Sequence, residues 1–292
     1  MRFIVGYTAT PAGSDALALG ARLARSWGAT LDIVLVLHSE HRPTLVPSDA
    51  GYDRFLHDRS EGWLADAARR VPAEVTTRTH LVYADTFSAG LMDTAGSLGA
   101  MLIVIGAAHD GIFGRFTLGS VAADLLHSSS VPVALAPIGT ADAGHALGIS
   151  RMTCTIGTKA GSEVLLAAGI RFAAAAHVPL RLVSLVAVDL PGGVEDKLVS
   201  KHGAIHAQEV LNYAAARLPE SVVATADVVF GDSIEQAIGS LDWNPDEIVL
   251  VGSSRLAQPR RLFLGSTAAK MLRALPVPMI VVPRESHLTQ GI

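Results

Sequence analysis

Apolar runs alternate with stretches of helical periodicity along the whole chain. Apolar runs in the first half predict strands, at Arg2–Tyr7, Leu31–Leu37, Glu74–Val82, Met101–Ile105 and Val133–Ala136. Amphipathic stretches between these runs predict helices, at Ser14–Ser26, Tyr52–Arg70, Phe87–Leu98 and Ser120–Ser128. Such regular alternation is typical of a mostly parallel sheet that helices cover on both faces.

The chain of 292 residues also repeats itself, at an offset of about half its length. Residues 102–137 align without a gap with residues 248–283. Self-similarity over such a length indicates a tandem duplication. We therefore expect an α/β protein with two tandem Rossmann-like domains, each a five-stranded mostly parallel sheet with helices on both faces. The predicted boundaries are 1–139 for the first domain, 140–150 for a linker and 151–292 for the second domain.

Composition and charge exclude several classes of partner but do not identify a function. The net charge is −4 and the pI is about 6.2, so nothing indicates a nucleic-acid partner. No apolar run approaches the roughly 18 residues that cross a bilayer, and no signal-peptide pattern is visible, so we expect no membrane partner and a cytoplasmic protein. The single cysteine, Cys154, excludes an internal disulfide, and we expect it to be a small buried residue.

A loop containing glycines follows the aliphatic fourth strand of each half. In the first half the loop begins at Gly106 and ends at Gly119 and Ser120, where a helix is predicted. Glycine allows a phosphate to approach the backbone, and the N–H groups of a helix amino terminus attract anions. We expect the Ser120 hydroxyl to cap this helix. The pattern predicts an anion site at the carboxyl ends of the strands.

The spacing of the whole loop resembles the universal stress protein family. ATP-binding members of that family carry Gly, two residues, Gly, nine residues, Gly and then Ser or Thr. The matching positions are Gly106, His109, Gly119 and Ser120 in the first half, and Gly252, Arg255, Gly265 and Ser266 in the second. The resemblance covers essentially the whole chain and implies the adenine nucleotide alpha hydrolase-like form of the Rossmann-like fold.

The resemblance also implies a ligand, ATP or AMP, with Mg²⁺ accompanying ATP. Further contacts would come from the residues after the motif, after the first strand and at the end of the second strand of each half: Val121 and Thr267, Thr8 and Lys159, Val36 and Leu185. Two features depart from the family pattern. His109 and Arg255 replace the second glycine, and Thr8 and Lys159 stand where ATP-binding members tend to have an aspartate.

Charge favours the second half as the nucleotide-binding one. Residues 1–146 carry 10 basic and 14 acidic side chains, whereas residues 147–292 carry 13 of each. Around the second loop stand Arg255, Arg260 and Arg261, whereas the first loop has Asp110 and only Arg115. Cationic side chains near a glycine loop stabilise bound polyphosphate.

Three functions fit these observations to different extents. The first is a non-catalytic stress-response regulator that binds ATP or AMP in at least one half, with at most weak ATP hydrolysis because no general base is evident. The second is a nucleotide-free protein that acts through an unknown protein partner. The third is an enzyme on a related fold, for which the signatures of nucleotidyl transferases and ATP pyrophosphatases are absent.

Other candidate features favour structural roles. His202 and His206 are predicted to be solvated helix residues rather than metal ligands, and Asp85 and Asp232 are predicted to be helix N-caps. The apolar last strands, Val133–Ala136 and Met279–Val282, have edges that must be covered. By resemblance these strands pair the two halves as an internal pseudo-dimer, and the whole chain can associate further as a homodimer.

Overall fold

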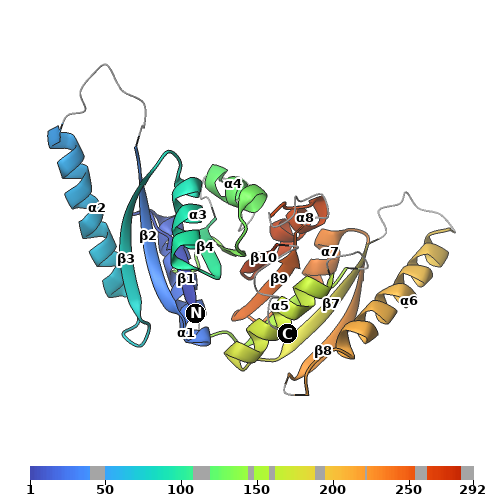
Figure 1. Cartoon of the computed structure of the whole chain (residues 1–292). Coiled ribbons are helices and arrows are strands. Elements are labelled where there is room, and N and C mark those ends of the chain that lie inside the picture. Colours follow the sequence, from blue (N-terminus) through green and yellow to red (C-terminus); the bar gives the residue numbers. More distant parts are fainter. Residues whose placement is uncertain are drawn as a thin grey trace.

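The computed structural model describes residues 1–39, 50–107, 119–143, 148–157, 162–187, 195–220, 222–253 and 262–283. Two α/β halves lie side by side (Figure 1). The first half contains β1 (Arg2–Gly6), α1 (Pro11–Trp27), β2 (Thr30–His38), α2 (Ala50–Arg70), β3 (Thr77–Ala84), α3 (Phe87–Leu98), β4 (Leu102–Gly106), α4 (Ser120–Ser128) and β5 (Val133–Ala136). The second contains β6 (Arg151–Thr155), α5 (Ser162–Ala176), β7 (Leu180–Ala187), α6 (Glu195–Ala215), β8 (Ala224–Gly231), α7 (Ile234–Gly239), β9 (Glu247–Gly252), α8 (Ser266–Ala274) and β10 (Met279–Val282).

The strands form one continuous sheet rather than two separate ones. The strand order is β3-β2-β1-β4-β5-β10-β9-β6-β7-β8, so each half contributes five neighbouring strands. All pairs within a half are parallel. Among the described strand pairs, only β5 and β10 are antiparallel, with Ala134 opposite Ile280. The expected tandem α/β fold is confirmed, and the last strands do pair across the two halves.

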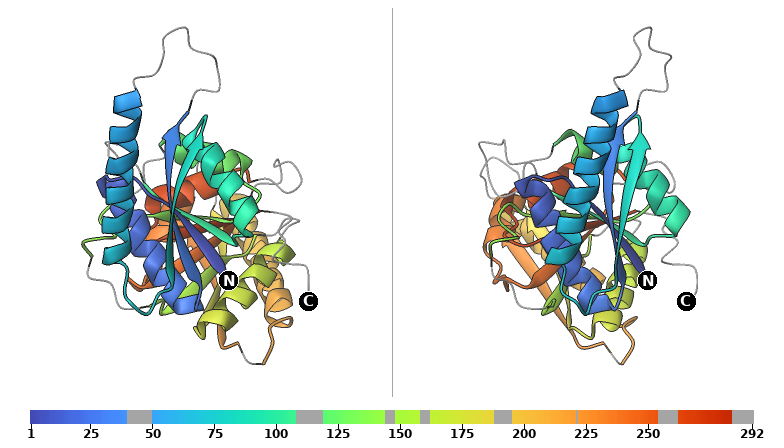
Figure 2. Two further views of the ribbon diagram at one scale, coloured as in Figure 1. Left: turned by 60° about the vertical axis from the view of Figure 1, so that its left-hand side comes forward. Right: turned by 90° about the vertical axis from the view of Figure 1, so that its left-hand side faces the viewer.

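Helices cover both faces of this sheet, as the buried aliphatic strands require. Buried side chains of α1, α2, α5 and α6 share one apolar cluster, and those of α3, α4, α7 and α8 share the other. In both views of Figure 2, α3 lies on the opposite side of the strands from α1 and α2. Each cluster contains residues of both halves, so the core is continuous across the seam. Within the described ranges, no helix has the length and apolar character needed to cross a membrane.

Trp27 is the largest side chain in the seam between α1 and α5. Its indole N–H donates to the backbone carbonyl of Phe172, at 2.7 Å, and both groups are buried. The indole also lies 5.3 Å from the Phe172 ring and 5.5 Å, edge-on, from the Phe3 ring. Aromatic pairs in these orientations add to the stabilisation that comes from burial alone.

The segment between the halves is fixed to α1 by a buried carboxylate. Asp15 is 2% exposed and accepts hydrogen bonds from the backbone N–H groups of Gly139, at 3.1 Å, and Ala141, at 2.8 Å. Gly139 has a φ of +83°, a conformation that favours glycine. A buried carboxylate needs such partners, so this turn and α1 form one unit.

A buried arginine joins α1 to the second half. The Arg22 side chain is 5% exposed, and its Nη1 lies 3.5 Å from Asp246 Oδ1. Burial lowers the pKa of Arg22, and the charge of Asp246 opposes that shift. Among the described residues, Arg22 Nε and Nη2 have no hydrogen-bond partner. The long ion pair offsets the desolvation of this cation only in part.

The expected elements are present, and the expected caps of α3 and α7 are wrong by one residue. The side chains of Thr86 and Ser233 accept hydrogen bonds from the N–H groups of Ala89 and Gln236, each at 3.1 Å. These two residues, and not Asp85 and Asp232, are therefore the N-caps. Residue type alone did not distinguish neighbouring residues that can all cap a helix.

Trp27→Ala is expected to lower the free energy of unfolding by about 3–5 kcal/mol, because it leaves a cavity where the cores of the two halves meet. Trp27→Phe keeps an aromatic ring and loses the hydrogen bond, at a cost of about 1 kcal/mol from that bond. Urea unfolding followed by circular dichroism measures both losses. Equal losses for the two variants would show that the ring contacts contribute nothing to the seam.

Candidate functional site

The glycine loops lie at the carboxyl ends of the parallel strands in each half. Gly106 ends β4 and Gly252 ends β9, whereas Gly119 and Gly265 precede α4 and α8 directly. Since β5 and β10 run antiparallel, the strands of the two halves run in opposite directions. Their carboxyl ends therefore lie at opposite ends of the strands in the shared sheet. The chain therefore has two separate candidate sites, each at the carboxyl ends of the strands of its own half.

The remaining predicted positions are only partly described. Val36 lies in β2 and packs closely against Gly90 of α3, where an added Cβ would lie 2.7 Å from Val36 Cγ1. Leu185 lies partly buried in β7. Val121 and Thr267 occupy the first turns of α4 and α8. His109, Lys159 and Arg255 lie outside the described residues, as do Asp110, Arg115, Arg260 and Arg261.

Both helices that follow the glycine loops are capped by glycine. Gly119 has φ −71° and ψ 169°, Gly265 has φ −72° and ψ 164°, and neither helix has a side-chain cap. The expectation that the Ser120 hydroxyl caps α4 is therefore wrong, because Ser120 is already the first helical residue. The cap residue thus gives no side-chain acceptor to the first-turn N–H groups of either helix, and N–H groups of this kind bind anions at helix amino termini.

Close packing provides a structural reason for one motif glycine. A Cβ on Gly106 would overlap the backbone carbonyl of Ala12, in the first turn of α1. Gly106 is thus required by the approach of α1 to the end of β4, whether or not a phosphate binds there. At Gly252, the nearest described atom to an added Cβ is Leu165 Cδ2, at 3.7 Å, which is an ordinary contact.

Thr8 takes part in the turn that precedes α1. Its Oγ1 lies 2.8 Å from Oγ1 of Thr10, and Thr10 caps the helix by accepting from Gly13 N at 3.3 Å. This uncharged hydroxyl pair stands where a carboxylate is expected in ATP-binding relatives. The turn is therefore stabilised by capping, without a group that carries a formal charge.

The helices of the two sites differ in charge at matching positions. Asp124 of α4 accepts a hydrogen bond from Ser88 Oγ, at 3.2 Å. The aligned residue of α8 is Lys270, and the same helix carries Arg273, whose Nη2 lies 3.2 Å from Glu235 Oε1. An acidic side chain disfavours a bound anion and a basic one favours it. The described residues therefore also favour the second half as the anion-binding one.

Ser253 contributes to the second site and was not predicted from the sequence. Its Oγ accepts from the backbone N–H of Phe263, at 2.8 Å, and donates to the carbonyl of Phe263, at 3.2 Å. These bonds join the end of β9 to the segment just before Gly265. The aligned residue of the first half is Ala107, which has no hydroxyl. This difference between the two repeats is the sequence signal that could have indicated a role for Ser253.

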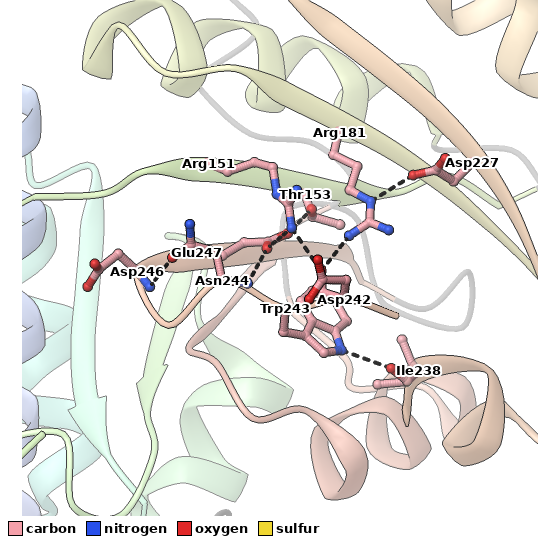
Figure 3. Close-up of polar contacts among 10 residues, drawn as sticks. All are labelled: Arg151, Thr153, Arg181, Asp227, Ile238, Asp242, Trp243, Asn244, Asp246 and Glu247. Carbon is pink, nitrogen blue, oxygen red and sulfur yellow. Dashed lines mark hydrogen bonds and ion pairs between the residues drawn. The ribbon is translucent and has the colours of Figure 1, made fainter. Parts of the chain in front are cut away.

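Apart from the glycine loops, the second half has a cluster of charged residues near the amino-terminal ends of β6, β7 and β9 (Figure 3). Arg151 Nη2 donates to Glu247 Oε2, at 2.5 Å, and to the carbonyl oxygen of Asp242, at 2.9 Å. Arg181 donates to Asp227 Oδ2, at 2.8 Å, and to the same Asp242 carbonyl, at 3.1 Å. Each guanidinium is paired with a carboxylate, so the cluster stabilises the strands.

The first half has a corresponding cluster in which one charge is reversed. Asp32 pairs in register with the third residue of β1, as Arg181 does with the third residue of β6. Arg2 donates twice to Asp32, at 2.9 and 2.5 Å, and His80 Nε2 lies 2.8 Å from Asp32 Oδ1. Hydrogen bonding to Asp32 raises the pKa of Arg2. The duplicated strands thus keep a polar cluster here with different charges.

Among the described residues, neither the cysteine nor the histidines suggest a catalytic or metal site, and the side chain of His202 lies outside this description. Cys154 is buried, as expected, and burial raises the pKa of its thiol to about 12, so it is not an activated thiolate. His206 is exposed on α6, 3.7 Å from Glu209. In the part of the chain that the structure describes, no three His, Cys, Asp or Glu side chains come close enough to hold a metal ion.

These features define a duplicated Rossmann-like protein with a glycine-capped helix at each site. The model of the universal stress protein family matches residues 1–137 and 149–283. The chain is 30% identical to universal stress protein Rv2319c of Mycobacterium tuberculosis (strain ATCC 25618 / H37Rv) and to Mb2346c of Mycobacterium bovis, over 97% of this chain and all of each relative. The chain therefore belongs to the universal stress protein family.

Solved structures of this family have the same overall fold. A universal stress protein from Archaeoglobus fulgidus DSM 4304 superposes with a TM-score of 0.61 at 15% identity, covering 97% of this chain and 96% of that one. A putative universal stress protein from Pseudomonas aeruginosa UCBPP-PA14 has a TM-score of 0.59 at 13% identity, covering 97% and 92%. The two-half architecture thus recurs at low sequence identity.

Gly106→Ala is expected to lower the free energy of unfolding by about 1–3 kcal/mol, because the added methyl group must displace the start of α1. The matched variant Gly252→Ala places its methyl group at ordinary contact distance from Leu165 and is expected to cost less. Thermal unfolding of the two variants and the parent tests this difference. Equal destabilisation would contradict the packing role of Gly106.

Proposed function

We propose that this universal stress protein is a non-catalytic stress-response regulator that binds an adenine nucleotide, ATP or AMP, in its second half. The observation that carries the proposal is the amino terminus of α8. There Gly265 caps the helix without a side-chain acceptor, and Lys270 lies in the second turn of the same helix. An anion at this position interacts with the first-turn N–H groups and with a positive local field.

The family loop pattern supports a nucleotide as the source of that anion. Its polyphosphate would lie along the loop that ends at Gly265 and Ser266, with Mg²⁺ bound when the ligand is ATP. Catalysis is not part of the proposal, because no described side chain near Gly265 acts as a base for an attacking water. The cytoplasmic location and the homodimer expected from the sequence stay predictions.

The first half supports a different role. Its motif glycine, Gly106, is explained by packing against Ala12, and its helix α4 carries Asp124 in place of a basic residue. These features favour a first half that has kept the fold and presents a surface to a protein partner. If the second half fails to bind nucleotide as well, this interaction role becomes the proposed function of the whole chain.

Gly265→Asp is expected to weaken ATP binding about tenfold or more, because a carboxylate then faces the phosphate at close range. Aspartate is a favoured N-cap residue, and the φ of −72° at this position suits it, so the variant should fold normally. The matched variant Gly119→Asp has nearly the same backbone geometry and is expected to leave ATP affinity unchanged. Calorimetric titration of nucleotide-stripped protein, with and without Mg²⁺, measures the affinities.

The two variants separate the possible outcomes. Loss of ATP binding in Gly119→Asp, with binding retained in Gly265→Asp, would move the site to the first half. Absence of binding in the parent, with no change of melting temperature in millimolar ATP or AMP, would reject nucleotide binding and leave the interaction role.

A further inference from the structure

The first half contacts the loop of the second half just before the proposed phosphate position. Leu262 N donates to the carbonyl oxygen of Ser129, at 2.8 Å, and Leu264 N donates to the carbonyl oxygen of Leu126, at 3.1 Å. Both acceptors lie at the carboxyl-terminal end of α4. The last carbonyl groups of a helix have no partner within the helix, so α4 offers these acceptors to the other half.

The segment Leu262–Leu264 is bonded to the end of α4 through every second residue. Leu262 and Leu264 are 1% and 8% exposed and belong to the apolar cluster that also contains Leu126. Phe263, between them, contacts His127 of α4 instead, with the two rings 5.0 Å apart and nearly perpendicular. Alternate residues of an extended segment point in opposite directions, so both sides of this segment are held.

Two elements from different halves therefore fix the backbone at Phe263. On one side, His127 and the end of α4 belong to the first half. On the other side, Ser253 of the second half bonds to both the N–H and the carbonyl of Phe263. Gly265, the N-cap of α8, follows two residues later. The position of this cap thus depends on the first half.

We infer that α4 of the first half, through the ring of His127, positions the loop with which the second half binds its ligand. His127 is a positioning residue, because its ring contacts Phe263, two residues before the helix cap Gly265, and acts through that contact. This inference rests on the proposed nucleotide site of the second half. It also gives α4 a role in the second half, since its carboxyl terminus holds the segment Leu262–Leu264 of that half.

The exposure of His127 distinguishes a positioning role from a contribution to core packing. His127 is exposed, so its removal leaves no internal cavity and should cost little global stability. An edge-on aromatic contact is worth an amount of free energy that corresponds to about a two- to tenfold change in an equilibrium constant. An effect of that size on loop position should appear in the affinity of the second site and be small in the melting temperature.

The test compares His127→Ala with His127→Phe in the full chain. His127→Ala is expected to weaken ATP binding at the second site by about two- to tenfold, because Phe263 loses its edge-on partner. His127→Phe restores a ring at the same position and is expected to restore the affinity. His206→Ala, which removes an exposed histidine from α6, is the matched control and should leave the affinity unchanged. Calorimetry in a Gly119→Asp background restricts the measurement to the second half.

Hydrogen exchange provides a second readout that needs no ligand. The amides of Leu262 and Leu264 are expected to exchange faster in His127→Ala than in the parent, and at the parental rate in His127→Phe. If the exchange changes as expected but the parent binds no nucleotide, the positioning contact stands and the proposed function fails. If ATP binds equally well to the parent and to His127→Ala, or if a faster exchange persists in His127→Phe, the positioning role of the ring is wrong.

Discussion

The antiparallel pairing of β5 with β10 is the contact on which the rest of the architecture depends. It joins two five-stranded sheets into one, so that neither half leaves its last strand as an open edge. The same pairing places α1 against α5, where Trp27 enters the shared core. Because the strands of the two halves then run in opposite directions, the candidate sites lie at opposite ends of the strands. The carboxyl end of α4 therefore reaches the loop of the second half.

Duplication preserved the backbone of the two halves and allowed their charges to differ. The buried position occupied by Asp32 in β2 is occupied by Arg181 in β7, and each is neutralised by different partners. On the helices that follow the glycine loops, Asp124 of α4 corresponds to Lys270 of α8. Substitutions of this kind leave the apolar packing intact, so the fold tolerates them while the affinity of each site for an anion changes.

Much of the fold was predictable because its information is local. Strands and helices follow from the period of apolar residues, and α3 was predicted at the observed bounds, Phe87–Leu98. The repeat predicted two similar halves, the apolar last strands predicted edges that must be covered, and the family resemblance implied that these strands pair with each other. The N-caps were less predictable, since Asp85 and Thr86 are adjacent and both residue types can cap a helix.

The sequence by itself determined the α/β class, the duplication and the positions of the glycine loops, because each of these is a pattern along the chain. Only the tertiary structure decided that Ala12 packs against Gly106, and that Ser253 and the end of α4 hold the segment before Gly265. Most of those contacts join residues far apart in the chain, Ser253 and Phe263 are ten apart, and neither periodicity nor residue type specifies which backbone groups meet there. The physical reason is that pairing partners are fixed by the packing of whole elements.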